Sequence, residues 1–303
     1  MMQPERAINV GTLGVDVSAL QTLRPRRAGL VRRLAASGTA RVGAVLMFIV
    51  LAAAVVGSAA APHDPTVIDP VQALMPPSSA HPFGTDNLGR DVLSRVLTGA
   101  RVSLSLAVVA GAGAMLIGLV VGAISGYAGG WIDSVFMRIV DLLLAFPALI
   151  LALALAGTLG EGYTSLLIAM VATLWARYAR LIRGAVLAER SRAYVEASRG
   201  LGAGAARLIG RHILPNVVWP FVVLLTLETS RLVLLVAALD YLGVGVQPPT
   251  PEWGTMVADG RLYIFSAPWM ILFPGVAIAV TVAAFNLFGE GLRDAVDPRM
   301  TQR

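Results

Sequence analysis

The chain has 303 residues, of which 56% are hydrophobic and only 14% are charged, and its mean hydropathy is +0.74. Soluble domains carry about 25% charged residues, so this composition excludes an ordinary soluble protein and indicates a polytopic membrane protein. All 24 basic residues are arginine, and the formal net charge is +6. This charge does not predict a nucleic-acid partner, because the arginines are sorted by side of the membrane, as in proteins that obey the positive-inside rule.

Two residue types are missing, and each absence excludes a kind of site. The chain has no cysteine, which excludes disulfides and thiolate metal ligands. It also has no lysine, and a Walker A loop needs its lysine to reach the nucleotide phosphates. We therefore expect no cofactor and no metal on this chain, and any ATP-driven role would need ATP and Mg²⁺ on a separate subunit.

Residues 1–41 form a polar tail that carries several arginines, and the leucines between them predict an interfacial helix near residues 20–36. The apolar run 42–61 is long enough for a first transmembrane helix, since about 20 residues cross the hydrocarbon core. The SAAAP sequence at its end is similar to a signal-peptidase site. However, the polar tail and the apolar run are both too long for a signal peptide, so we expect a retained helix.

An extracytoplasmic segment over residues 62–100, rich in Pro, Ser and His, is expected to follow the first helix. A five-helix core over 101–292 and a cytoplasmic tail over 293–303 complete the predicted organisation. The long, continuously apolar runs exclude a β-barrel, whose strands alternate, so the predicted fold is all-α with six transmembrane helices. The further spans are expected near residues 101–126, 135–158, 163–183, 216–240 and 268–289.

The distribution of arginine predicts the orientation of these spans. With the N-terminus inside, 19 of the 24 arginines fall in cytoplasmic segments. Because cytoplasmic loops are enriched in arginine, we expect both termini and the segment 177–211 in the cytoplasm.

The second predicted span carries a stripe of small residues at every fourth position. Such a stripe lets another helix backbone approach closely. The approaching helix could belong to this chain or to a partner membrane subunit. The stripe consists of Ala110, Ala114, Gly118, Gly122 and Gly126.

The most informative polar element extends from residue 194 to residue 216, between two apolar runs. A helix over residues 191–201 is expected to bury Tyr194, Ala197 and Leu201 on one side. Glycines after it permit a turn where a side chain would clash, and a second short helix over 205–212 is expected before Pro215. The small residues Ala197, Ser198 and Gly202 leave room for a partner surface, while the alternative is a basic loop that only fixes topology.

Charged residues inside apolar runs are a second kind of candidate, because ionised groups in a span usually face a bundle interior or a water-filled path. Glu228 and Arg231 have the i, i+3 spacing of an ion pair. They could be a purely structural pair, or they could line a water-filled path through the membrane. Asp240, at the outer end of the same helix, is a further candidate. Arg138 and Asp141 are expected to pair structurally.

The spacing of the polar element resembles the EAA loop of ABC-importer permeases, in which EAA, three residues, Gly and nine residues precede I-x-L-P. Here Ser198 stands for the second Ala and His212 for the Ile. Four segments resemble the dipeptide/oligopeptide/nickel permease family and its second, C-type subunit, and the resemblance covers roughly residues 40–300. They are HPFGTDNLGRDVLSRVLTGARVSL (81–104), RIVDLLLAFPALILAL (138–153), RHILPN (211–216) and LGVGVQPPTPEWG (242–254).

This resemblance implies a type I ABC importer fold in a bacterial inner membrane. The implied partners are a second homologous permease, two ATPase subunits and an extracytoplasmic substrate-binding protein. The implied substrates are di- or oligopeptides, with nickel chelates or another small solute as the alternative. The loop over 190–215 would couple to the ATPases through Tyr194, Glu196, Ala197, Ser198, Gly202, Arg207, Arg211, His212 and Pro215.

The same resemblance gives a meaning to two outer segments. One is a turn followed by an amphipathic helix, which could simply lie on the outer membrane interface. The other is a stiff proline-rich connection, in which each Pro fixes φ. Either could dock the binding protein, and the candidate contact residues are Asp86, Arg90, Asp91, Gln247 and Trp253.

Two other classes of function fit the residues less well. An ion-coupled secondary transporter would favour paired broken helices in two halves of the chain, and no convincing pair is present in the sequence. An intramembrane hydrolase would need a nucleophile or metal constellation, but the histidines His63, His81 and His212 all lie outside the predicted spans. We therefore expect no catalytic residues and no enzymatic activity.

Overall fold

The computed structural model describes residues 37–296, so the predicted interfacial helix of the N-terminal tail and the last residues of the C-terminal tail lie outside the described part. Within it the regular elements are all helical, which confirms the all-α prediction. Four helices are each long and apolar enough to cross a membrane. They are α3 (Gly38–Ala60), α4 (Val92–Ala128), α7 (Tyr163–Arg190) and α12 (Trp269–Val296).

Two bent pairs of helices bring the candidate spans to as many as six, if each pair counts as one span. The first pair is α5 (Gly130–Leu144) and α6 (Ala148–Leu159), and the second is the run from α9 (Ala205–Arg207) through the π-helical turn η2 (Leu208–Ile213) into α10 (Leu214–Tyr241). The shorter elements are η1 (Pro70–Gln72), α8 (Ala193–Gly200), α11 (Trp253–Gly260) and η3 (Arg261–Tyr263).

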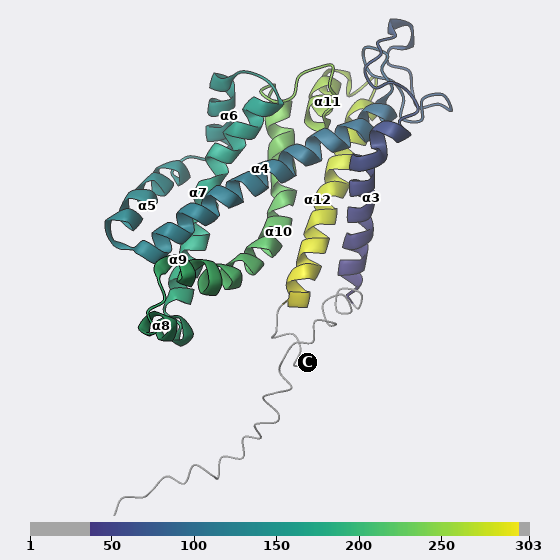
Figure 1. Cartoon of the computed structure of the whole chain (residues 1–303). Coiled ribbons are helices and arrows are strands. Elements are labelled where there is room, and N and C mark those ends of the chain that lie inside the picture. Colours follow the sequence, from purple (N-terminus) through teal and green to yellow (C-terminus); the bar gives the residue numbers. More distant parts are fainter. Residues whose placement is uncertain (1–36, 297–303) are drawn as a thin grey trace, which may run out of the picture.

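Helix α4 joins two elements that were expected to be separate. The Asp91 carboxylate accepts a hydrogen bond from the Ser94 backbone N–H and so caps the helix at its first turn. No proline follows for 37 residues, so the amphipathic outer helix and the second span form one helix. At about 1.5 Å per residue it is about 55 Å long, which exceeds a hydrocarbon core of about 30 Å. Figure 1 shows it crossing the bundle obliquely.

The stripe of small residues on α4 packs against α7 of the same chain. A Cβ atom added to Gly122 would lie 2.6 Å from the carbonyl oxygen of Ala179, and one added to Gly118 would lie 2.5 Å from Cβ of Tyr178. The two helices therefore touch backbone to backbone, as small residues at every fourth position allow. Of the two alternatives left open by the sequence, the structure shows contact within the chain.

The third span, predicted near residues 135–158, is broken in the middle. Its residues form α5 and α6, whose axes differ by 90°. The break lies at Pro147, which has φ −58° and ψ 128° and begins α6. A proline disfavours helical backbone at the preceding residue and has no N–H to donate, so α5 ends before it. The second bend, of 59°, lies between Val218 and Val223 in α10.

The bundle places the polar elements at its two ends. Helices α3 and α12 run side by side, while α8 and α9 lie at one end and α11 and the segment over 61–91 lie at the other (Figure 1). A buried apolar core built mainly from α4, α7, α10, α11 and α12 connects the ends.

Candidate functional site

Helix α8 is attached to the bundle by a single buried side chain. Val195 is fully buried and packs in a cluster with residues of α7, η2 and α10, including Ile182 and Ile213. The expectation that Tyr194, Ala197 and Leu201 form the buried side is wrong, and Leu201 is 89% exposed. The buried residue of α8 is Val195, which lies about 100° around the helix from Tyr194, so the inward face is a different one from the face that was expected.

Tyr194 adds a polar attachment between α8 and its neighbours. Its hydroxyl lies 2.5 Å from Oε1 of Glu189 and 3.1 Å from the carbonyl oxygen of His212, and it accepts a hydrogen bond of 2.9 Å from Nδ2 of Asn216. Burial, followed by the hydrogen bond to Glu189, raises the pKa of Tyr194, so the hydroxyl keeps its proton at neutral pH. This one group therefore connects α8 with the last turn of α7 and the start of α10.

Two arginines connect the same region to the end of α4. Arg190 Nη1 donates to the carbonyl oxygen of Tyr127 at 2.7 Å. The guanidinium of Arg199 lies 5.8 Å from the centre of the Tyr127 ring, within the range of a cation–π contact. A displacement of α8 is thus physically connected to α4, α7 and α10.

The remaining coupling candidates lie together around this element. Gly202 has φ +84°, a backbone conformation that residues other than glycine rarely adopt. No atom lies within 4 Å of a Cβ built at this position. The turn after α8 therefore requires glycine for its backbone and not for internal packing. Ser198 and His212 are half-buried, and the exposed members are Tyr194, Glu196, Ala197, Gly202, Arg207, Arg211 and Pro215.

Inside the bundle, Glu228 is the centre of a cluster of three charges. Its carboxylate accepts hydrogen bonds from Nη1 of Arg231 at 3.1 Å and from Nη1 of Arg177 at 3.2 Å. The Glu228 side chain is 10% exposed, whereas those of Arg177 and Arg231 are 49% and 66% exposed. The predicted contact between Glu228 and Arg231 is confirmed. The second arginine was missed, because α7 and α10 are distant in sequence.

A second expected pair does not form. Asp141 pairs with Arg180 of α7 instead of with Arg138. Helix α5 packs along α7, and this packing brings Asp141 to Arg180. The next arginine of α7 behaves in the same way, since Nη2 of Arg183 lies 2.5 Å from Oδ2 of Asp133.

Asp240 is buried at the C-terminal end of α10, and its Oδ1 accepts a hydrogen bond of 2.6 Å from the N–H of Val246. It therefore stabilises the turn that leads into the proline-rich connection. Beside it opens a cavity of about 470 Å³, which Asp240 lines together with Asn87, Gln247, Asp259 and Arg261. The cavity lies where α10, α11 and the outer loops meet.

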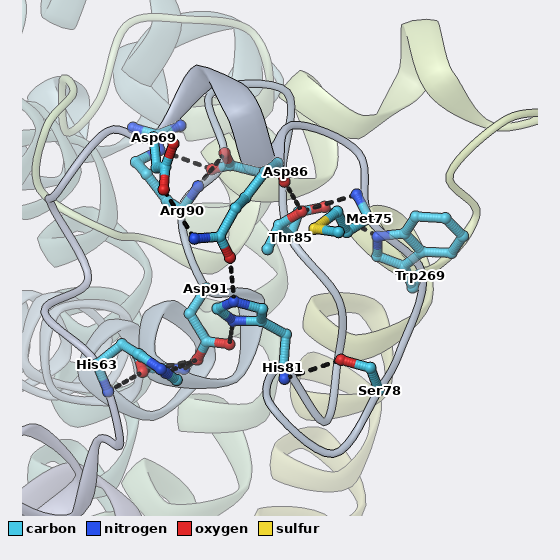
Figure 2. A network of polar contacts seen from close by, with 12 residues as sticks. His63, Asp69, Met75, Ser78, His81, Thr85, Asp86, Arg90, Asp91 and Trp269 are labelled. Carbon is cyan, nitrogen blue, oxygen red and sulfur yellow. Dashed lines mark hydrogen bonds and ion pairs between the residues drawn. The ribbon is translucent and has the colours of Figure 1, made fainter.

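Most of the outer docking candidates point inward. Arg90 Nε donates to Oδ2 of Asp86 at 2.6 Å, and Nε of Arg95 lies 3.5 Å from the same oxygen. Asp86, Arg90 and Asp91 are all buried in the network drawn in Figure 2. Their contacts hold the fold of the outer segment, and docking through these three side chains would require that network to open.

The network also joins the outer segment to the helices. Trp269 at the start of α12 donates from Nε1 to the carbonyl oxygen of Thr85 at 2.9 Å (Figure 2). Trp253, another docking candidate, is buried and donates from Nε1 to the carbonyl oxygen of Val96 on α4. Gln247 is half-buried and lines the cavity, so among the five candidates it has the most accessible side chain.

A bundle of apolar helices with a protruding polar element at one end indicates a multi-pass membrane protein. A family model for the "Binding-protein-dependent transport system inner membrane component" matches residues 118–302. The chain therefore belongs to this family of inner-membrane transport permeases. Membership also implies that the chain works in a complex with other transporter components.

Individual relatives cover most of both chains. The chain is 40% identical over 290 residues to the probable D,D-dipeptide transport system permease protein of Escherichia coli (strain K12), with 95% of this chain and 97% of that protein covered. It is 39% identical to the oligopeptide transport system permease protein of Bacillus subtilis (strain 168), with 88% of each covered. It is 41% identical to the nickel transport system permease protein of Escherichia coli (strain K12), with 79% and 86% covered.

Proposed function

We propose that the chain is a permease subunit of an ATP-driven importer of di- or oligopeptides, in a bacterial inner membrane with both termini cytoplasmic. The observation that carries the proposal is the element around α8, which exposes Leu201 and Gly202 while Val195 and Tyr194 attach it to the bundle. Peptide relatives at 39–40% identity support the substrate class. The proposed complex contains a second homologous permease, two ATPase subunits and an extracytoplasmic binding protein.

In the proposed mechanism, the exposed face of α8 docks on an ATPase subunit. When ATP binding closes the ATPases, α8 is displaced toward its counterpart on the second permease. The hydrogen bonds of Tyr194 and the contacts of Arg190 and Arg199 with Tyr127 transmit that displacement to α7, α10 and α4. The path then opens outward, and hydrolysis returns it to the inward state. ATP and Mg²⁺ are held by the ATPases.

The charge cluster of Glu228 supplies the proposed contact with the passenger. One carboxylate is shared by two guanidiniums, so each of Arg177 and Arg231 keeps donors free for a further acceptor. Both arginine side chains are about half exposed or more, and an ionised carboxylate such as a peptide C-terminus is the ligand that a guanidinium binds best. Asp240 contributes to the outer part of the path.

Substitution of Arg231 tests this contact. We expect Arg231→Gln and Glu228→Gln to lower peptide uptake at least several-fold, because each removes one half of an intramembrane ion pair. Uptake is measured in proteoliposomes, with thermal stability as the check on folding. Arg180→Gln is the matched control, since it removes an α7 arginine whose partner is the exposed Asp141. Unchanged uptake by well-folded Arg231→Gln and Glu228→Gln proteins would remove these residues from the path.

The substrate class is tested with the complete complex. The permease, its partner ATPases and the binding protein are reconstituted, and ATP hydrolysis is measured with a panel of di-, tri- and longer peptides and with a nickel chelate. We expect peptides to raise the rate and the chelate to have little effect. The nickel relative makes the chelate the second candidate, and stimulation by the chelate alone would favour it. Uptake that needs an ion gradient and no ATP would point to a secondary transporter.

A further inference from the structure

His63, His81 and Asp91 come together at the outer end of the bundle, away from the coupling element and the charge cluster. His63 follows the end of α3, and its backbone N–H donates to Oγ of Ser94 at 3.0 Å. Asp91 is the residue that caps α4. His81 comes from the loop between them, and Figure 2 shows the Asp91 carboxylate between the two histidine side chains.

Both nitrogens of the His81 ring face oxygen atoms. Nδ1 lies 2.9 Å from Oδ1 of Asp91, and Nε2 lies 2.7 Å from Oε1 of Gln72. The Gln72 amide is oriented by its own hydrogen bond, in which Nε2 donates to Oδ2 of Asp69 at 2.7 Å. Gln72 therefore presents its oxygen to His81, and His81 must donate from Nε2.

This arrangement leaves a problem at the other nitrogen. In a neutral ring that carries its proton on Nε2, Nδ1 has only a lone pair, and that lone pair faces a buried carboxylate. Two acceptors at 2.9 Å repel each other unless a cation lies between or beside them. Either a second proton on the ring or a bound metal ion would supply that positive charge.

The second histidine favours the metal ion. Nδ1 of His63 lies 3.8 Å from Oδ2 of Asp91, and the two histidine rings are 4.8 Å apart. One ligand atom from each of His63, His81 and Asp91 can be chosen so that all three lie within 4.8 Å of one another. A proton on His81 requires no second imidazole, whereas two imidazole nitrogens and a carboxylate oxygen are a usual ligand set for zinc and related divalent ions, at bond lengths of about 2.0–2.2 Å.

The surroundings of His81 have the second feature of a metal site. A histidine that binds a metal usually donates its other N–H to a carbonyl or carboxylate oxygen, which fixes the tautomer. Gln72 accepts that bond here, and Asp69 holds Gln72 in turn. The His63 side chain is 44% exposed, so one side of the site is open to an entering ion and to water as a further ligand.

We propose that His63, His81 and Asp91 bind one divalent transition-metal ion, with zinc as its simplest representative. The ion would join His63, three residues after the end of α3, to the cap of α4 and to the loop that carries His81. In a chain without cysteine this bond takes the place that a disulfide often has in an extracytoplasmic segment. Such a site departs from the expectation that this chain binds no metal, and it requires neither the substrate nor the ATPases.

The test is zinc binding by the purified full chain, prepared without a polyhistidine tag and treated with a chelator beforehand. We expect saturable binding of one equivalent per chain in isothermal titration calorimetry at neutral pH. His63→Asn should abolish it, and the exposed position of His63 makes this variant tolerable to the fold. His212→Asn is the matched control, because His212 is the third histidine of the chain and lies in the element around α8, away from the proposed site. Zinc binding by the His212→Asn chain should be unchanged.

A second variant separates the proposed ligand set from a chance histidine contact. Gln72→Ala keeps all three ligands but removes the acceptor of His81 Nε2, and we expect it to weaken binding by about 10–100-fold. Absence of saturable binding by the unmodified chain would overturn the proposal. Equal binding by the His63→Asn and unmodified chains would also overturn it. Neither result bears on the proposed transport function.

Discussion

Glu252, which caps the start of α11, shows how a single buried acid is held in this bundle. Ser103 Oγ of α4 donates to its Oε1 at 2.7 Å, and the N–H of Thr255 in α11 donates to its Oε2 at 2.9 Å. The residue is completely buried. Burial raises the pKa of Glu252 above its ordinary value of 4.5, although the hydrogen bonds from Ser103 and Thr255 act in the opposite direction. Folding therefore favours the protonated carboxyl.

The raised pKa predicts a pH dependence with a defined sign. The contribution of Glu252 to stability is fully present below its unfolded pKa and is lost as pH rises through the folded value. Each unit of pKa difference corresponds to about 1.4 kcal/mol. Glu252→Gln resembles the neutral acid and escapes this loss, so its Tm should increase relative to that of the unmodified chain between pH 5 and pH 8. A constant Tm difference across that range would contradict the raised pKa.

At the residue scale, helix spacing predicted one of two local pairs, and no distant pair could be predicted. Glu228 and Arg231 are i, i+3 on one helix, so their contact follows from helix geometry. Arg177 joins them from another helix, and nothing in a single sequence gives that register. The same limit explains why Arg138 was paired wrongly with Asp141 and why His63 and His81 were not brought together.

The contact between α4 and α7 is the clearest case at the scale of elements. Its backbone approach depends on Gly118, Gly122 and Gly126, where an added Cβ would lie 2.5–3.0 Å from atoms of α7. The helices can approach because these residues have no side chain. Since α7 continues to the coupling element, this contact is also part of the proposed route from α8 into the bundle.

We expect Gly122→Ala to destabilise the chain by about 1–3 kcal/mol, because the new methyl group forces the two helices apart. Gly184→Ala is the control on α7, where no atom lies within 4 Å of an added Cβ. Alanine there should be neutral or stabilise by up to about 1 kcal/mol through helix propensity. Unfolding in detergent measures both changes. Equal stability of the two variants would contradict the close α4–α7 contact.

The element boundaries show what hydropathy can and cannot predict. Long apolar runs gave the positions of α3, α7, α10 and α12 to within a few residues at most of their ends, although α7 and α12 both continue well beyond their predicted ends. The break at Pro147 was missed because hydropathy is continuous through it. Proline alone does not identify such a break, since α12 contains Pro274 and continues. Neighbouring helices decide whether the freed backbone groups are accommodated.

At the scale of the whole molecule, the two ends of the bundle carry different chemistry. One end presents the glycine-punctuated element around α8, and the other presents the outer segment and α11 (Figure 1). Between them many apolar side chains are exposed, such as Phe48 and Val55 on α3, as expected for a surface that faces lipid or a second membrane subunit. The fold class and the transport family could be predicted from the sequence, because composition and ordered motifs both indicated them. The face that α8 exposes could not be predicted from the sequence, because it depends on how Val195 packs against the other helices.

The central claim is that α8 carries the force of separate ATPases into this chain, and site-specific photocrosslinking tests it most directly. The chain has no cysteine, so Leu201→Cys provides a unique thiol for a benzophenone maleimide at a highly exposed position. In the assembled complex we predict a crosslink to an ATPase subunit, with a yield that changes when ATP binds. Phe265→Cys, fully exposed near the opposite end, should give no crosslink to an ATPase. A crosslink from Phe265 to an ATPase, or none from Leu201, would contradict the account.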